Sequence, residues 1–259
     1  DPTNMLDKLD LLKGYNYYFQ VTINPYDKLI ERNVAPKKQI IESFIKLSNL
    51  IGKKRMVWRY DPIILTDKID TGYHKKYFEI LAAKLKNYTE RCVISFVDMY
   101  RKTERNMKSF HAMDLSEEYM LEIGKTLSEI GATCGLKIQP CSELVDLSAV
   151  GIEHGKCIDD KLIEDIIGQK IDVQKDRNQR EECCCVASID IGAYNTCKHG
   201  CLYCYANSSD YAVSNNTMKH NPQSPLLIGD VEPDDVITER KMGSYKDGQL
   251  SFLINFFIE

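Results

Sequence analysis

Three cysteines stand close together near the C-terminal end of the sequence. Cys197, Cys201 and Cys204 have the spacing Cys-x3-Cys-x2-Cys within the stretch IGAYNTCKHGCLYCYAN. Three thiolates cannot complete the tetrahedral shell of a zinc ion, but they can hold three corners of a four-iron, four-sulfur cluster. The fourth iron of such a cluster is open to another ligand. The spacing therefore predicts a 4Fe-4S cluster with one vacant coordination position.

Four further cysteines could form a second site. They are enough to fill every corner of another iron-sulfur cluster, or to bind one structural zinc ion. The candidate ligands are Cys141, Cys157, Cys183 and Cys185.

Each of the other side chains near the thiols could have either a functional or a structural role. His199 within the three-thiol loop and His154 could ligate metal or move a proton, although such histidines more often hydrogen-bond the local backbone. Tyr203 and Tyr205 could pack over a cluster and exclude water, or belong to the core. Gly200 is expected to let the backbone turn between ligands.

The cysteine content also favours a metal site. Ten cysteines are many for an intracellular chain of 259 residues, and eight of them lie between residues 141 and 204. Clustered thiols in a reducing compartment bind metal more often than they pair as disulfides. The other two, Cys92 in a predicted strand and Cys134 at a predicted helix end, are expected to be small core residues.

Composition narrows the class of protein. No apolar run is long enough for a membrane span and the N-terminus lacks the features of a secretory signal, so we expect a cytoplasmic protein without a membrane partner. The net charge of -4 gives no general affinity for nucleic acid, although residues 100–108 and 175–180 are locally basic. There is no Walker loop, GxGxxG, HExxH or GxSxG motif, and a thiol protease would not need seven clustered thiols.

The elements that must position these residues alternate between strand and helix. Helices are predicted from Pro36 to Gly52, over residues 73–85, after a Ser116 cap and after Asp159. Apolar, β-branched segments predict five strands, at residues 17–23, 55–65, 91–100, 135–140 and 185–194. The fold class is therefore α/β with parallel strands, either a partial or complete β/α barrel of the TIM type or an open sheet.

In both architectures the catalytic and binding residues lie at the carboxyl ends of the strands. Ion pairs between Arg59 and Asp61 and between Asp98 and Arg101 are the structural alternative to a functional role there. We expect Tyr194, Asn195 and Tyr203 to share cofactor binding with the loop thiols. The strand-end residues are Arg59, Tyr60, Asp61, Asp98, Tyr100, Arg101, Cys141, Glu143, Tyr194 and Asn195.

The domain prediction is one barrel-like domain over residues 1–207 that ends in the cysteine cluster. Residues 208–259 become rich in Asn, Ser and Pro, so they are expected to form an irregular extension packed on the same domain. No internal repeat is present.

The thiol loop resembles the signature of radical S-adenosylmethionine enzymes. CKHGCLYC has that spacing, with the aromatic Tyr203 directly before the third cysteine, and is closest to the form found in relatives of spore photoproduct lyase. In those enzymes S-adenosyl-L-methionine binds the open iron and is cleaved to a deoxyadenosyl radical. Their loop normally follows the first barrel strand, so a circularly permuted barrel would be needed to bring it to the same rim here.

Over essentially its whole length the chain resembles the domain of unknown function 1848 family. The resemblance rests on segments such as VWRYDPIILTDK, CVISFVDMYRKTERNM, GIEHGKCIDD and KDRNQREECCC. It implies further strands ahead of Asp1, for a total near eight. Relatives usually read Cys-Gly-Cys at positions 183–185, which makes Cys184 the spare thiol, and adjacent thiols rarely bind one ion without strain.

Three functions follow as hypotheses. The first is a radical-SAM-like enzyme with a 4Fe-4S cluster, a substrate of unknown class and a reductase or ferredoxin as electron donor. The second is an electron-transfer or structural iron-sulfur protein with every iron ligated, and the third is a zinc-binding module. Kinship with photoproduct lyases makes nucleic acid a candidate partner through Arg101, Lys102 and Arg105.

Overall fold

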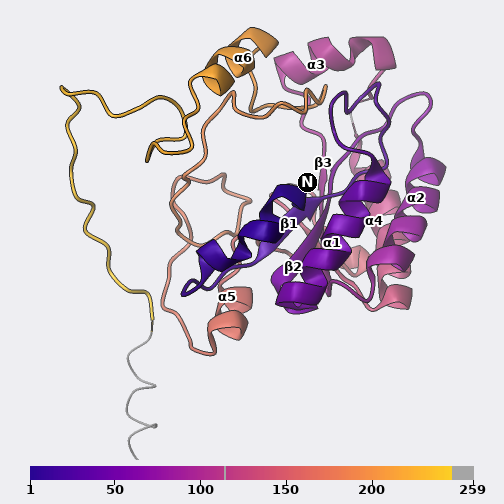
Figure 1. Ribbon diagram of the computed structural model, residues 1–259. Helices are drawn as coiled ribbons and strands as arrows, with labels where there is room; N and C mark the ends of the chain where they lie inside the picture. Colours follow the sequence, from indigo (N-terminus) through magenta and orange to yellow (C-terminus); the bar gives the residue numbers. More distant parts are fainter. Residues whose placement is uncertain (114, 247–259) are drawn as a thin grey trace, which may run out of the picture.

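A computed structural model describes residues 1–113 and 115–246 and contains one four-stranded parallel sheet (Figure 1). The strands pair in chain order, β1-β2-β3-β4, so each strand lies beside its neighbour in sequence. Their bounds are β1 Phe19–Thr22, β2 Met56–Ile63, β3 Arg91–Phe96 and β4 Lys137–Pro140. The first four predicted strands are confirmed, with ends that differ by a few residues.

Three long helices cover one face of this sheet (Figure 1). They are α1 Lys37–Ile51, α2 Thr71–Leu85 and α4 Glu117–Cys134. The predicted start signals hold, because α1 begins directly after Pro36 and the Ser116 side chain accepts a hydrogen bond from Tyr119 N at the start of α4. Each helix buries one apolar stripe, as amphipathic crossover helices must.

The core lies between these helices and the sheet. Val21, Trp58, Cys92 and Ile138 face each other in register across the four strands and are all buried. Trp58 stacks on Phe78 of α2 with ring centroids 4.8 Å apart. The prediction that Cys92 is a core residue is confirmed, and Cys134 packs at the core margin as the last residue of α4.

All three long crossover helices lie on the same face, as in a β/α barrel and not as in a doubly wound sheet. Within the described residues the sheet does not close, since β1 and β4 are its two edges. The α/β class is therefore confirmed, whereas a closed barrel is not formed by the four strands.

The other face of the sheet is covered mainly by irregular chain. This irregular chain lies within residues 153–207 and contains the short helix α5 Asp160–Ile167. The preceding 3-10 turn, η4 Ser148–Val150, packs instead on α4 in the core on the helix side. Leu162 of α5 packs on Val57 and Val93, and Asp159 both caps α5 and forms an ion pair with Arg91 of β3. These contacts attach the layer to the sheet.

The fifth predicted strand is not part of the sheet. In residues 185–194 only Val186 forms a β-bridge, an isolated one to Lys175. Ile191 is 90% exposed and Tyr194 67% exposed, so this segment is not a buried strand. The prediction was wrong because β propensity reflects burial against neighbours, and this segment has no neighbouring strand of the sheet.

The remaining elements lie outside the sheet and its three long helices. They are η1 Thr3–Leu12, η2 Lys53–Arg55, α3 Arg101–Met107, η3 Lys108–Phe110 and α6 Asp210–Met218. The predicted extension, 208–259, contains α6, and its end, 247–259, lies outside the described residues. No described helix combines the length and apolar character that crossing a membrane requires.

Candidate functional site

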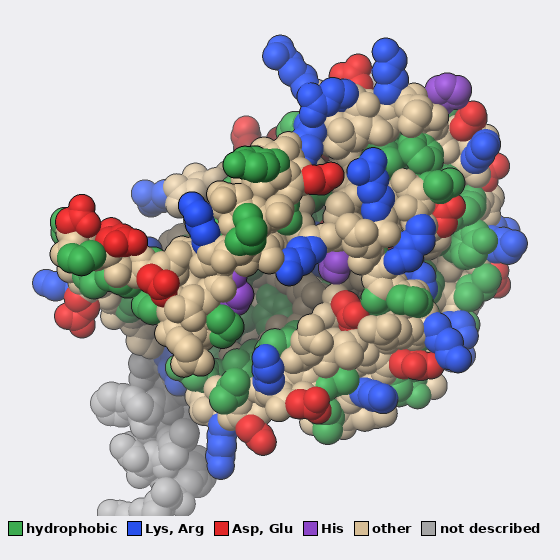
Figure 2. Space-filling view, turned by 45° about the horizontal axis from the view of Figure 1, so that its top comes forward, with side chains coloured by type: hydrophobic (Ala, Val, Ile, Leu, Met, Phe, Trp, Pro, Cys, Tyr) green, Lys and Arg blue, Asp and Glu red, His purple; other side chains and the backbone are tan. Residues whose placement is uncertain are grey.

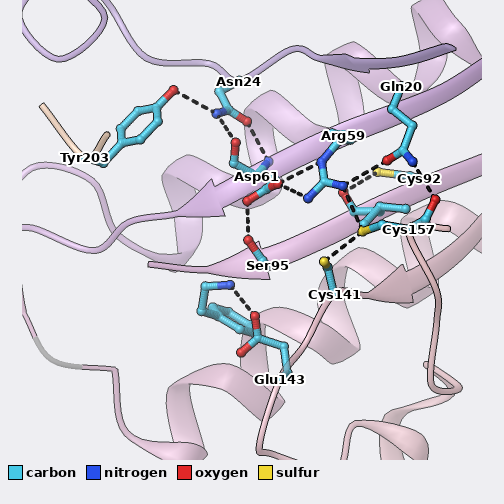
Figure 3. Close-up of polar contacts among 12 residues, drawn as sticks. Gln20, Asn24, Arg59, Asp61, Cys92, Ser95, Cys141, Glu143, Cys157 and Tyr203 are labelled. Atoms are coloured by element: carbon cyan, nitrogen blue, oxygen red, sulfur yellow. Dashed lines mark hydrogen bonds and ion pairs between the residues drawn. The ribbon is translucent and has the colours of Figure 1, made fainter. Parts of the chain in front are cut away.

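Polar side chains gather on the sheet face turned away from the three long helices (Figure 3). Because side chains alternate along a strand, Arg59 and Asp61 of β2 point away from Trp58 and Tyr60, which are in the core. Arg59 Nε donates to Asp61 Oδ2 at 2.8 Å, and a second guanidinium nitrogen contacts the same oxygen. The Ser95 hydroxyl of β3 donates to the other carboxylate oxygen.

Asp61 is fixed by its backbone as well. The Asn24 side chain, just after β1, donates to Asp61 O at 2.7 Å and accepts from Asp61 N at 2.8 Å. The predicted ion pair between Arg59 and Asp61 is therefore confirmed. The other predicted pair is wrong, because Asp98 pairs with Arg180 at 2.8 Å and not with Arg101. Arg180 belongs to the irregular layer. It is far from Asp98 in the sequence, so no local pattern predicts this contact.

The four cysteines of the second predicted site come together beside Arg59. Cys141 Sγ and Cys157 Sγ are 2.8 Å apart, and an Arg59 guanidinium nitrogen donates to Cys157 Sγ at 2.9 Å. The Cys185 thiol hydrogen-bonds Cys157 and Cys183 in turn. Ile158 N donates to Cys185 Sγ at 3.3 Å. We call Cys141, Cys157, Cys183 and Cys185 the four-thiol cluster.

Contacts within the four-thiol cluster separate the pKa values of its members. The hydrogen bond from Cys157 lowers the pKa of Cys141 to about 7 and that of Cys185 to about 5. The contact with Cys141 raises the pKa of Cys157, and burial raises the pKa of Cys183 to about 11. Two sulfurs are thus stabilised as thiolates by two that keep their protons.

The three-thiol loop, residues 197–204, is anchored to the chain after β1. Leu202 is buried among Tyr26, Ile30 and Met107, and its N–H donates to Ile30 O at 3.0 Å. An isolated antiparallel bridge joins Cys201 to Glu31. Leu202 therefore pins the backbone between the second and third thiols.

Gly200 allows the turn in this loop. Its φ of +63° is in the left-handed region, and a Cβ there would lie 3.3 Å from Asn33 Nδ2. Asn33 N also donates to His199 O at 2.9 Å. The predicted role of Gly200 is confirmed. The contact with Asn33 uses the carbonyl oxygen of His199 and a residue distant in sequence, so it does not test the expectation that the His199 side chain hydrogen-bonds the local backbone.

Tyr203 joins the loop to a buried carboxylate. Its hydroxyl donates to Glu31 Oε1 at 2.5 Å, and Glu31, only 3% exposed, forms an ion pair with Lys37 at the start of α1. Burial raises the pKa of Tyr203 above its usual range, so the hydroxyl keeps its proton. Tyr205, by contrast, is 71% exposed and does not cover the loop.

Two cavities flank the loop. One of about 440 Å³ lies along the edge strand β1 and is lined by both polar and apolar side chains, Cys201 among them. The other, of about 380 Å³, lies between the loop and α6 and is lined by Cys197, Lys198 and Gly200. The polar side chains that line the first are those of Asp1, Gln20, Thr22, Glu31, Lys37, Asp61, His199, Cys201 and Tyr203.

The loop thiols differ in environment. Cys197 is exposed, and a hydrogen bond from the His199 side chain lowers its pKa. Cys201 is half-buried, and burial raises its pKa to about 11. Cys204 is half-buried, and its carbonyl accepts from Lys102 Nζ at 3.2 Å.

Neither set of thiols forms a finished ligand cage. Among residues 1–113 and 115–246, no three His, Cys, Asp or Glu side chains are grouped so that they could hold a metal ion. The four-thiol cluster brings its sulfurs into contact, and the loop brings its thiols onto one anchored turn. Any metal binding in either place is therefore a proposal that requires the side chains to move.

Two predicted cofactor residues lie outside the contacts of the thiols. Tyr194 is largely exposed. Asn195, with a φ of +60°, closes a loop, because its side-chain oxygen accepts from both Ser208 N and Ser208 Oγ. His154 is exposed as well.

Sequence reasoning missed several residues of this region. Asn24 and Ser95 lie at strand ends. They could therefore have been found by the rule that selected Arg59 and Asp61, namely that functional residues lie at the ends of parallel strands. Glu31 and Lys37 lie in a loop and at a helix start, and no spacing in the sequence marks them as a buried ion pair.

On the face shown in Figure 2, acidic and basic side chains are interspersed and do not form a field of one sign. Fold and site together define an α/β protein with a singly wound parallel sheet and a thiol-rich layer on its polar face. Residues 1–206 match the family model described as Domain of unknown function (DUF1848), and the chain belongs to this family. Searches of curated proteins and of solved structures gave no match.

Proposed function

We propose that this protein is an iron-sulfur enzyme of the radical-SAM type, in which Cys197, Cys201 and Cys204 hold a four-iron cluster. The main supporting observation is the position of the loop: its middle thiol, Cys201, lines a cavity of about 440 Å³ whose wall carries both polar and apolar side chains. An iron with a vacant coordination position needs such a space, because the molecule that fills this position must reach the iron through it.

The donor set fits the group. All three ligands are thiols on one short loop, and the backbone of that loop is fixed by Leu202 and Gly200. The thiols as they stand are not grouped as ligands, so loading requires their side chains to turn toward one another. When bound, such a cluster supplies an electron and one open coordination position.

The residues around the cavity bind and orient. Glu31, Lys37 and Asp61 offer charges of both signs along its wall, as recognition of a ligand with amino and carboxylate groups requires. Tyr203 holds the loop against Glu31 and keeps that carboxylate hydrogen-bonded. His199 stabilises the thiolate of Cys197, the most exposed of the three ligands.

The alternative is an electron-transfer protein with a closed cluster. It is supported by the contact between His199 and Cys197, because an imidazole this close to the loop could take the fourth position. A ligand that must bind the open iron would then have no place.

The test is anaerobic reconstitution with iron and sulfide, followed by electron paramagnetic resonance of the dithionite-reduced protein. The radical-SAM proposal predicts that added S-adenosylmethionine changes the signal and that deoxyadenosine forms. Cys201→Ala should abolish both effects, and Cys134→Ser, at the end of α4, should preserve both. A loaded wild-type cluster whose signal ignores S-adenosylmethionine would exclude the proposal and favour electron transfer.

A further inference from the structure

We propose that the four-thiol cluster is a second, closed metal centre, independent of the three-thiol loop, in which four thiolates bind a zinc ion or an iron-sulfur cluster. Both metals share one donor chemistry, since tetrahedral sets of four sulfurs select zinc or iron-sulfur centres.

Convergence is the first argument. The four thiols come from three separate parts of the chain: Cys141 follows β4, Cys157 precedes α5, and Cys183 with Cys185 lies in the irregular layer. Thiols this far apart in sequence are nevertheless neighbours: Cys141 Sγ lies 2.8 Å from Cys157 Sγ, and Cys185 Sγ accepts from Ile158 N, the residue after Cys157, at 3.3 Å. Four thiols gathered in one region supply the number of ligands that a closed metal centre needs once their side chains turn toward one ion, whereas a disulfide needs only two.

The groups that surround the sulfurs also suit a metal site. An Arg59 nitrogen donates to Cys157 Sγ and Ile158 N donates to Cys185 Sγ, and these donors would stabilise the negative charge that each sulfur takes on as a metal ligand. Arg59 is already paired with Asp61, so its charge is shared. Four thiolate ligands in this part-buried place would have only this shared cation beside them, and a bound metal would supply the further positive charge that they need.

The sulfur separation distinguishes the possible states. The 2.8 Å between Cys141 Sγ and Cys157 Sγ exceeds the roughly 2.05 Å of a disulfide. It is shorter than the separation of about 3.8 Å that follows from Zn–S bonds of about 2.3 Å in a tetrahedron. The two sulfurs are therefore close enough to become ligands of one ion after a small movement, and metal entry would release the thiol protons and separate the sulfurs.

The irregular layer that carries the cluster has few buried apolar side chains of its own. Between residues 168 and 200 the buried apolar side chains are Cys183, Cys185 and Val186, and no helix or paired strand is formed there. So small an apolar core cannot hold an irregular segment on the sheet, and proteins in this situation use covalent or metal cross-links. A metal at the four-thiol cluster would join this segment to the ends of β4 and the start of α5.

The experiment uses the full chain with the loop disabled by Cys197→Ala, Cys201→Ala and Cys204→Ala. This variant is purified without oxygen from cells supplied with both zinc and iron. We expect it to keep either about one zinc per chain, or about four irons with equivalent labile sulfide. Metal analysis, sulfide assay and visible absorbance separate the two arms.

Matched variants test the ligands in the same background. Cys157→Ser and Cys185→Ser should each lower bound metal at least tenfold. Cys184→Ser, in the neighbouring position, should leave it unchanged, because its thiol contacts the backbone oxygen of Glu182 instead. If a serine variant fails to fold, removal of metal from the loop-disabled chain by a chelator should still increase proteolysis within residues 141–207.

Two results would overturn the proposal. One is a loop-disabled protein that holds only trace zinc and iron after purification and after anaerobic reconstitution. The other is a Cys141–Cys157 disulfide in that protein, found by mass spectrometry of unreduced peptides. Neither result bears on the loop, because the loop thiols are absent from the variant.

Discussion

Arg59 links the separate groups on the polar face of the sheet. One side chain contacts the carboxylate of Asp61, the amide oxygen of Gln20 and the sulfur of Cys157. A planar guanidinium can make these contacts at once because its donors point in fixed directions, and a lysine could not replace them.

Replacing Arg59 by Gln should destabilise the protein. Asp61 would remain part-buried without its cation, and we expect the free energy of unfolding to fall by about 2–3 kcal/mol, somewhat less than for a fully buried pair. Urea denaturation measures this. Lys38→Gln breaks an exposed pair with Glu42 and should change it by less than about 0.5 kcal/mol. Equal effects of both variants would contradict the role given to Arg59.

Glu143 should make stability depend on pH. Burial raises its pKa to about 7 from an ordinary value near 4.5, although Phe96 N donates to the carboxyl at 2.8 Å. The folded state therefore keeps a proton that the unfolded state has lost, and stability falls as pH rises from about 4.5 to 7.

Glu143→Gln removes this titration and keeps the acceptor for Phe96 N. We expect the variant to gain about 2 kcal/mol relative to the wild type at pH 8, and little at pH 4. Urea midpoints at the two pH values give the comparison. A difference that is constant across pH would show that Glu143 does not titrate as described.

At the level of elements, α4 approaches the sheet closely at Gly131. A Cβ at this position would lie 2.6 Å from Ile138 Cγ1 on β4, so the glycine is required by packing although it lowers helix propensity. The contact sets the separation between α4 and β4.

Gly131→Ala should therefore destabilise the protein by about 1–3 kcal/mol, despite a propensity gain of about 1 kcal/mol. Thermal or urea unfolding tests this. Combined with Ile138→Ala, the same change should cost little or nothing, because the clashing atoms are gone. A stabilised single variant would mean that the helix can move away freely.

The whole molecule has two unequal layers. The layer of α1, α2 and α4 shares one large apolar core with the sheet, whereas residues 153–200 contribute only a small apolar cluster around Leu162 (Figure 1). Regions with few buried apolar contacts open at lower free energy than the core.

Hydrogen exchange should reveal this difference. In metal-free protein we expect amides of β2 and β3 to exchange at least a hundredfold more slowly than those of residues 187–200. Mass spectrometry of peptic peptides supplies the readout. Uniform protection across both layers would show that the irregular layer is as stable as the core.

The sequence alone determined much of the sheet and its helices, because period and end signals are local properties. Strands at 17–23, 55–65, 91–100 and 135–140 and the helix after Pro36 were predicted from apolar pattern, proline and glycine. Arg59 and Asp61 followed from the rule that chemistry gathers at strand ends. The candidate thiols were chosen by number and spacing, so their grouping into sets could be stated but their distances could not.

Only the tertiary structure decided which residues meet. Residues 185–194 have the composition of a strand, yet no partner strand lies beside them, since pairing depends on neighbours that the segment itself does not contain. Likewise, Asp98 meets Arg180, Glu31 meets Lys37 and Tyr203, and Cys141 meets Cys157. Local sequence fixes what each segment can form, whereas contacts between distant segments depend on the packing of the whole chain.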